Sequence, residues 1–195
     1  MIPLNGYQII LASDSPRRKV FMESLKIPFS LKKFSVDESF PPNLRGSAIA
    51  EFIVQQKNFP FLNIIKPKQI VITADTIVWC ENQCLGKPKD KTTAQQMLRF
   101  LSGKSHQVIT SVGFLTSKKF QIITENTKVY FNHLTDQEID RYIEDESPLD
   151  KAGAYGIQDS IGDVAIKRIE GSYTNVVGLP LAQVKEKISF LVKEE

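Results

Sequence analysis

Apolar positions recur along the chain with two different periods, which predicts strands interleaved with helices. The predicted strands cover residues 7–12, 29–35, 69–74 with a continuation at 77–79, 107–116, 120–131 and 164–169. Helical spacing begins near residues 16, 47, 92, 135 and 181, and each start carries a capping residue, a proline or an apolar repeat. Because the two kinds of element alternate throughout, the sequence predicts an α/β fold with a mixed sheet flanked by helices.

The first predicted turn joins a strand directly to a helix N-terminus. Its residues, 11–18, read LASDSPRR, with Ser15 suited to the N-cap and Pro16 to the first helical turn. Unpaired N–H groups and the helix dipole attract anions there, and Arg17 and Arg18 add guanidinium donors. Successive helical residues point about 100° apart, so the two arginines are expected to do different jobs. The alternatives are a phosphate site and a capped surface helix with two solvated arginines.

Asp75 follows the most apolar strand, where an acid is costly without a partner. Its position predicts either a catalytic carboxylate at a strand's carboxyl end or an aspartate that caps a turn. Asp37 and Glu38 follow the second predicted strand. Mg²⁺ takes one or two carboxylates together with phosphate oxygens and water, so Asp75 with Glu38 would suffice. Taken alone, the Asp37-Glu38 pair is typical of a solvated loop.

Two lysines are candidates to neutralise phosphate charge, although most lysines are simply solvated. Lys57 ends the second predicted helix, and Lys87 is fixed between Gly86 and Pro88. Residues 150–158 are rich in glycine and small side chains. We expect this stretch to be neither a core element nor a linker.

Composition excludes several classes of function. The 195 residues suffice for one domain or two lobes, and a net charge of +3 without basic blocks disfavours nucleic acid as a partner. Neither a signal peptide nor a membrane-spanning run is present, so we expect a cytoplasmic protein without a membrane partner. A zinc site needs about four ligands, and Cys80 and Cys84 could draw only on His106 and His133, so two ordinary thiols are expected rather than a metal site. No P-loop or serine-nucleophile motif occurs.

Six segments, in order, resemble the Maf family of nucleoside triphosphate pyrophosphatases, which are structurally related to the inosine triphosphatases. They are LASDSPRR (11–18), ADTIV (74–78), GKPKD (86–90), LSGKSHQVITSV (101–112), DKAGAYGIQ (150–158) and GSYTNVVGLPL (171–181). The resemblance implies one Maf-like domain over residues 1–195, with an elongated mixed sheet and two lobes around a central cleft. It implies hydrolysis of a nucleoside triphosphate to the monophosphate and pyrophosphate with Mg²⁺ or Mn²⁺, and a protein that is often a homodimer.

The resemblance also assigns site residues. Asp75 takes the position of the catalytic proton acceptor and metal ligand, and Glu38 that of a second acid at the metal. The family's substrate-site serine falls on Ser13, and its basic phosphate-binding residues fall on Arg17, Arg18, Lys57 and Lys87.

Three positions separate the family's branches. Arg17, Thr76 and Gln158 match the branch that acts on dTTP and UTP, whereas the 7-methyl-GTP branch tends to Trp, Gln and Glu. The amide of Gln158 can both donate to and accept from a uracil or thymine edge. Gly86 departs from those pyrimidine-branch members that carry Glu there.

The sequence therefore predicts a dTTP/UTP pyrophosphatase, with modified pyrimidine nucleotides as further candidate substrates. The alternatives are the 7-methyl-GTP subtype and a cell-division (septum formation) regulator that binds nucleotide.

Overall fold

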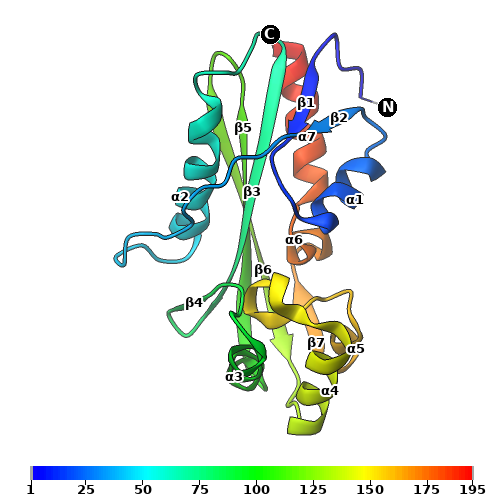
Figure 1. Ribbon diagram of the computed structural model, residues 1–195. Helices are drawn as coiled ribbons and strands as arrows, with labels where there is room; N and C mark the ends of the chain where they lie inside the picture. Colours follow the sequence, from blue (N-terminus) through cyan, green and yellow to red (C-terminus); the bar gives the residue numbers. More distant parts are fainter. Residues whose placement is uncertain (1, 195) are drawn as a thin grey trace. The chain divides into compact units, whose positions relative to one another are not determined.

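The computed structural model describes residues 2–194, and Figure 1 shows strands and helices alternating along them. The elements are β1 (Gln8–Leu11), α1 (Pro16–Ser24), β2 (Phe29–Leu31), α2 (Ser47–Asn58), η1 (Phe59–Phe61), β3 (Gln69–Cys80), β4 (Gln83–Leu85), α3 (Lys91–Leu101), β5 (Ser105–Leu115), β6 (Phe120–Phe131), α4 (Asp136–Glu146), η2 (Pro148–Asp150), η3 (Ala152–Ala154), α5 (Ser160–Ala165), β7 (Ile166–Glu170), α6 (Tyr173–Val177) and α7 (Leu181–Glu194).

Within residues 2–194, seven strands form one mixed sheet. Its order is β2-β1-β3-β5-β6-β7, and β4 pairs with β3. The strand β1 is parallel to both β2 and β3, whereas the pairs β3–β4 and β6–β7 are antiparallel. The predicted mixed α/β fold is therefore confirmed. The chain divides into two compact units, the first comprising residues 2–75, 110–125 and 178–194, and the second residues 76–109 and 126–177.

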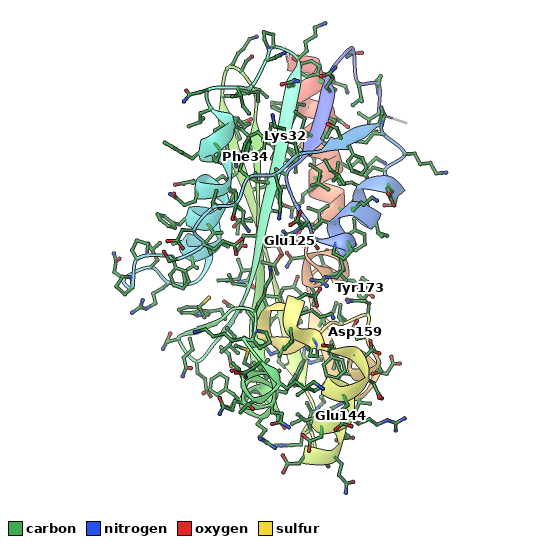
Figure 2. All side chains as sticks on the ribbon, viewed as in Figure 1. Lys32, Phe34, Glu125, Glu144, Asp159 and Tyr173 are labelled. Carbon is green, nitrogen blue, oxygen red and sulfur yellow. The ribbon has the colours of Figure 1, made fainter. Side chains whose placement is uncertain are left out.

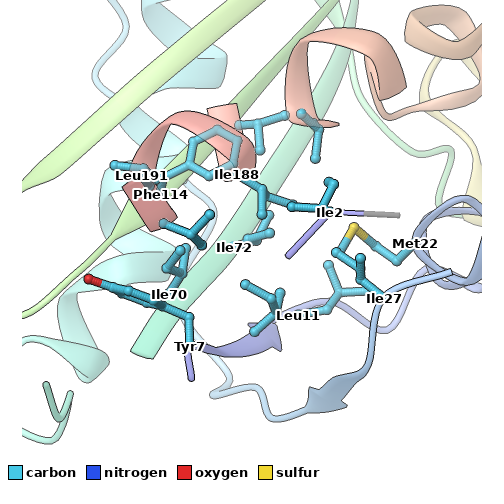
Figure 3. Close-up of a cluster of buried hydrophobic side chains, with 14 of the residues drawn as sticks. Ile2, Tyr7, Leu11, Met22, Ile27, Ile70, Ile72, Phe114, Ile188 and Leu191 are labelled. Carbon is cyan, nitrogen blue, oxygen red and sulfur yellow. The ribbon is translucent and has the colours of Figure 1, made fainter. Parts of the chain in front are cut away.

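In the first unit, side chains alternate across the strands and define two layers of core. Ile70, Ile72 and Ala74 of β3 pack with α1 and α7, through residues such as Met22 and Ile188. Figure 3 shows this cluster, in which apolar side chains from the strands meet those of α7. The alternate positions of β3 face the other way. Val71 packs with Phe61 of η1, and Thr73 accepts a hydrogen bond from the amide nitrogen of Asn58 at the end of α2.

The second unit has a core of its own, built from α3, α4, α5 and the strand segments of this unit. Its buried members are Val78, Cys80, Leu85, Ala94, Leu98, Leu101, Val108, Val129, Phe131, Ile139, Tyr142, Ile143, Ala154, Tyr155, Ile161 and Ala165. The helix start expected near residue 135 is confirmed, because Thr135 and Glu138 bond reciprocally in a capping box at the start of α4.

Three expectations were wrong. Asp75 does not end a strand, because β3 continues to Cys80 without interruption. The strand β2 stops at Leu31 rather than residue 35, and residues 32–35 are exposed. The middle of the small-residue stretch 150–158 belongs to the core, because Gly153, Ala154 and Tyr155 are buried.

Glycine explains the last difference. Gly153 has a φ of +70°, and a Cβ there would lie 2.9 Å from Cγ2 of Val78, so only glycine lets the backbone approach β3 so closely. Two short helices, α5 and α6, were also not predicted. None of the helices among residues 2–194 is both long and apolar enough to span a membrane.

Candidate functional site

The turn between β1 and α1 is held by two serine hydroxyls. Ser15 caps the helix as predicted, since its Oγ accepts from the backbone N–H of Arg18 at 3.4 Å, and Pro16 occupies the first turn. The Oγ of Ser13 accepts from the N–H of Ser15 at 3.2 Å. The strand–turn–helix arrangement expected of an anion site is therefore formed.

Arg18 ties this turn to two other segments of the first unit. Its Nε donates to the carbonyl of Gly178 at 2.9 Å, and its Nη1 donates to the carbonyl of Ala74 at 2.9 Å and to Oγ of Ser13 at 3.4 Å. Loss of hydration lowers the pKa of this guanidinium, while the nearby Asp75 acts in the opposite direction. Arg18 thus positions the turn against the residue that precedes Asp75. Arg17 lies beside it in the first turn and is half-buried.

Asp75 is buried, with 8% of its surface exposed, and the structure shows why an acid is tolerated inside β3. The alternation of the strand places it on the same face as Thr73, which is the face that α2 covers. Lys57, one residue before Asn58 in α2, contacts Oδ1 of Asp75 at 2.7 Å. The ammonium compensates the carboxylate's charge where solvent is scarce.

Lys57 also joins the second candidate metal ligand. Its Nζ lies 3.1 Å from Oε1 of Glu38, whose side chain is half exposed. Asp75 and Glu38 thus both contact the ammonium nitrogen of Lys57. Their carboxylates offer the oxygen ligands that Mg²⁺ and Mn²⁺ prefer. Asp37 is used differently, since its carboxylate accepts from the backbone N–H and hydroxyl of Ser39. These bonds lower the pKa of Asp37 and make it a local turn cap.

A pocket of about 400 Å³ opens beside the N-terminus of α1. Its lining is basic and hydroxylic, consisting of Ser13, Asp14, Ser15, Pro16, Lys19, Leu31, Lys32 and Lys33. The ammonium of Lys33 pairs with Asp14, which anchors one wall. Sequence reasoning missed this wall. The signal that could have found it is the Lys32-Lys33 pair, directly after β2.

The remaining candidate residues belong to the second unit. Thr76 follows Asp75 in β3, and Lys87 lies exposed in the loop between β4 and α3. The carbonyl of Gly86 accepts from the N–H of Gly153 at 3.0 Å, which fixes this loop to the 150–158 stretch. Gln158 is exposed and donates to Oδ1 of Asp159 at 2.9 Å.

The structure brings five of the candidate residues together in the first unit: Ser13, Arg18, Glu38, Lys57 and Asp75. Their contacts run through the carbonyl of Ala74, which both Arg18 and Lys57 approach. Their roles in a reaction stay predictions.

The fold and the site together define the class of the protein: a mixed α/β protein with a hydroxyl- and cation-lined helix N-terminus next to a lysine-paired aspartate. The Ham1 protein of Staphylococcus aureus shares the fold, with a TM-score of 0.52 and 13% identity over 96% of this chain and 100% of that one.

The chain belongs to the Maf family, because the family model described as "Maf-like protein" matches residues 8–190. Curated relatives agree along nearly the whole length. A protein of Christiangramia forsetii is 50% identical over 182 residues, which cover 93% of this chain and 92% of that protein. One from Flavobacterium johnsoniae is 46% identical over 189 residues, covering 97% of both. Both relatives are named "dTTP/UTP pyrophosphatase". The resemblance stated from sequence motifs is therefore confirmed.

Proposed function

We propose that this protein hydrolyses nucleoside triphosphates, with a preference for dTTP and UTP, to the monophosphate and pyrophosphate. The observation that carries the proposal is the ion pair between buried Asp75 and Lys57. Arg18, which holds the turn before α1, donates to the carbonyl of the residue that precedes Asp75. The names of the relatives give the substrate class. Residues 1–195 would act as one domain, with a small-molecule substrate, in the cytoplasm and as a homodimer.

The chemistry follows from what each side chain offers. Water forms a new P–O bond at the α-phosphorus, the bond to the bridging oxygen breaks, and pyrophosphate leaves. Asp75 accepts the proton of the attacking water, through the carboxylate oxygen that does not contact Lys57. Basic side chains offset the charge that grows on the departing pyrophosphate, and we assign this to Arg17, Arg18, Lys57 and Lys87. The hydroxyl of Ser13 and the N-terminus of α1 bind phosphate oxygens.

We further assign a divalent cation to the two carboxylates beside Lys57. Asp75 and Glu38 would hold it, because both reach the same Lys57 ammonium and supply oxygen ligands. Bound there, Mg²⁺ or Mn²⁺ would polarise the phosphoryl oxygens as a Lewis acid. Thr76 and Gln158 would select the base, with Gln158 contacting the uracil or thymine edge.

The test is pyrophosphate release from UTP, dTTP, CTP, GTP and 7-methyl-GTP, with Mg²⁺ or Mn²⁺ and with excess chelator. We expect turnover of UTP and dTTP that the chelator removes. Turnover concentrated on 7-methyl-GTP would keep the chemistry and overturn the assigned subtype. No turnover by folded protein would overturn the enzyme proposal and favour a nucleotide-binding regulator of cell division.

A further inference from the structure

The side-chain amide of Gln158 is hydrogen-bonded through its nitrogen. Its Nε2 donates to Oδ1 of Asp159 at 2.9 Å. An ionised carboxylate can only accept hydrogen bonds, so it selects the NH₂ end of the amide and turns the carbonyl oxygen away. A flip of the amide would bring Oε1 against a carboxylate oxygen, which is repulsive.

Asp159 is itself held by donors of the second unit. The hydroxyl of Tyr142 donates to Oδ2 at 2.8 Å, and Nζ of Lys151 lies 3.2 Å from the same oxygen. The side chains of Asp159 and Lys151 are only 10% and 12% exposed. Burial, followed by the bond to Asp159, raises the pKa of Tyr142, which therefore stays a donor. Figure 2 labels Asp159 just before α5, on the segment that carries Gln158.

The backbone is shaped around this pair. A Cβ on Gly156 would lie 2.5 Å from Oδ2 of Asp159 and 2.6 Å from Nε2 of Gln158. Glycine at this position lets the chain fold back over both side chains. The N–H of Gly156 also donates to the hydroxyl of Tyr142 at 3.2 Å, which closes the cluster. Tyr142 and Lys151 therefore hold Asp159 in place, and Asp159 in turn accepts from its exposed neighbour Gln158.

We propose that Asp159 is a positioning residue that sets base selectivity by locking the amide of Gln158 with its carbonyl oxygen outward. This rests on the proposed function, in which Gln158 contacts the base. Uracil and thymine carry a donor, the N3–H, between two carbonyl groups, whereas N3 of cytosine is an acceptor. A locked carbonyl accepts from N3–H but opposes the lone pair of cytosine. The second N–H of Gln158 remains available to a carbonyl of uracil or thymine. An amide able to flip would accommodate both kinds of base.

The test compares Asp159→Asn with the unsubstituted protein and with Asp163→Asn, a matched change at an exposed residue of α5. Asparagine can donate as well as accept, so the amide of Gln158 regains both orientations. We expect the ratio of kcat/KM for UTP to that for CTP to fall about tenfold in Asp159→Asn. The ratio should be unchanged in Asp163→Asn.

A double-mutant cycle separates positioning from a general structural effect. In a Gln158→Ala background, Asp159→Asn should leave the UTP:CTP ratio where Gln158→Ala alone puts it. A further fall in that background would show that Asp159 acts by another route, and would overturn the inference.

If Asp159→Asn does not fold, NMR of the unsubstituted protein tests the lock. One proton of the Gln158 side-chain amide, assigned by its loss in Gln158→Ala, should be shifted downfield and protected from solvent. Two protons like those of exposed glutamines would overturn the lock. If the wild-type protein prefers UTP and the folded Asp159→Asn protein keeps the same UTP:CTP ratio, the inference about Asp159 is overturned and the proposed function stands. Wild-type protein that hydrolyses neither UTP nor dTTP would overturn the proposed function instead.

Discussion

The ion pair with Lys57 explains how the carboxylate of Asp75 is stabilised inside an apolar strand. The ammonium of Lys57 lies 2.7 Å from Asp75 and 3.1 Å from Glu38. A single lysine therefore compensates the charge of both carboxylates that are proposed to hold the metal. Removing Lys57 would leave the buried carboxylate without its compensating charge. The assigned phosphate role and this pairing involve the same atom, and both follow from the position of Lys57 at the end of α2.

His106 carries a pH dependence of stability that is unrelated to the proposed reaction. It is buried in the second unit, its Nε2 lies 2.7 Å from the hydroxyl of Tyr155, and its Nδ1 has no partner among the described residues. Burial lowers its pKa from 6.5 to about 4. The unfolded chain therefore takes up a proton on this group at a higher pH than the native protein, so stability is retained above pH 6.5 and falls toward pH 4.

We expect the protonation of His106 to lower the free energy of unfolding by about 2 kcal/mol when the pH falls from 7.5 to 5. Urea unfolding at both pH values should show a smaller loss in His106→Gln than in the unsubstituted protein. His133→Gln, at the exposed second histidine, is the matched control and should keep the wild-type loss. Equal losses in all three proteins would contradict the assignment.

At the scale of elements, Arg18 joins α1 to β3 and to the segment that precedes α7. It uses backbone carbonyls of Ala74 and Gly178, which a shorter or apolar side chain would leave without this donor. We expect Arg18→Met to lower the unfolding free energy by about 2 kcal/mol. Arg141→Met, at an exposed arginine of α4, should stay within about 0.5 kcal/mol of the unsubstituted protein. Thermal or urea unfolding measures both, and equal stabilities would contradict the joining role.

Elements with strong local signals could be predicted from the sequence. The Ser15 cap, the Thr135 capping box and the apolar run of β3 each depend on residues a few positions apart. The helices α5 and α6 were missed because they are only six and five residues long and lack a full apolar repeat. The 150–158 stretch was misjudged because small residues are buried there by contact with Val78, which periodicity does not report.

The candidate site, too, could be predicted from the sequence only in part. The identities of Ser13, Arg18, Lys57 and Asp75 could be proposed from motifs, and the anion-binding turn from local rules. Their contacts could not, because the approach of Lys57 to Asp75 requires α2 to pack on a particular face of β3. The pocket beside α1 could not be predicted either, because it forms only when β2 pairs with β1 and brings Lys32 and Lys33 to the turn.

At the scale of the whole molecule, the chain passes repeatedly between the two compact units, and the proposed site residues are divided between them. The first unit holds the groups assigned to metal and proton transfer and, apart from Lys87, the groups assigned to phosphate. The second holds Thr76, Lys87 and Gln158, of which two are assigned to the base. We therefore expect changes in the second unit, such as Asp159→Asn, to alter selectivity more than the rate of the favoured substrate.

The most direct measurement is the rate of pyrophosphate release from UTP by Asp75→Asn, beside the unsubstituted protein and Asp163→Asn. Asparagine keeps an oxygen acceptor for Lys57, so thermal unfolding should show a folded protein. The loss of the proton acceptor should lower kcat about a thousandfold, while Asp163→Asn keeps the wild-type rate. A folded Asp75→Asn within about tenfold of the wild-type kcat would contradict the assignment of Asp75 as the base.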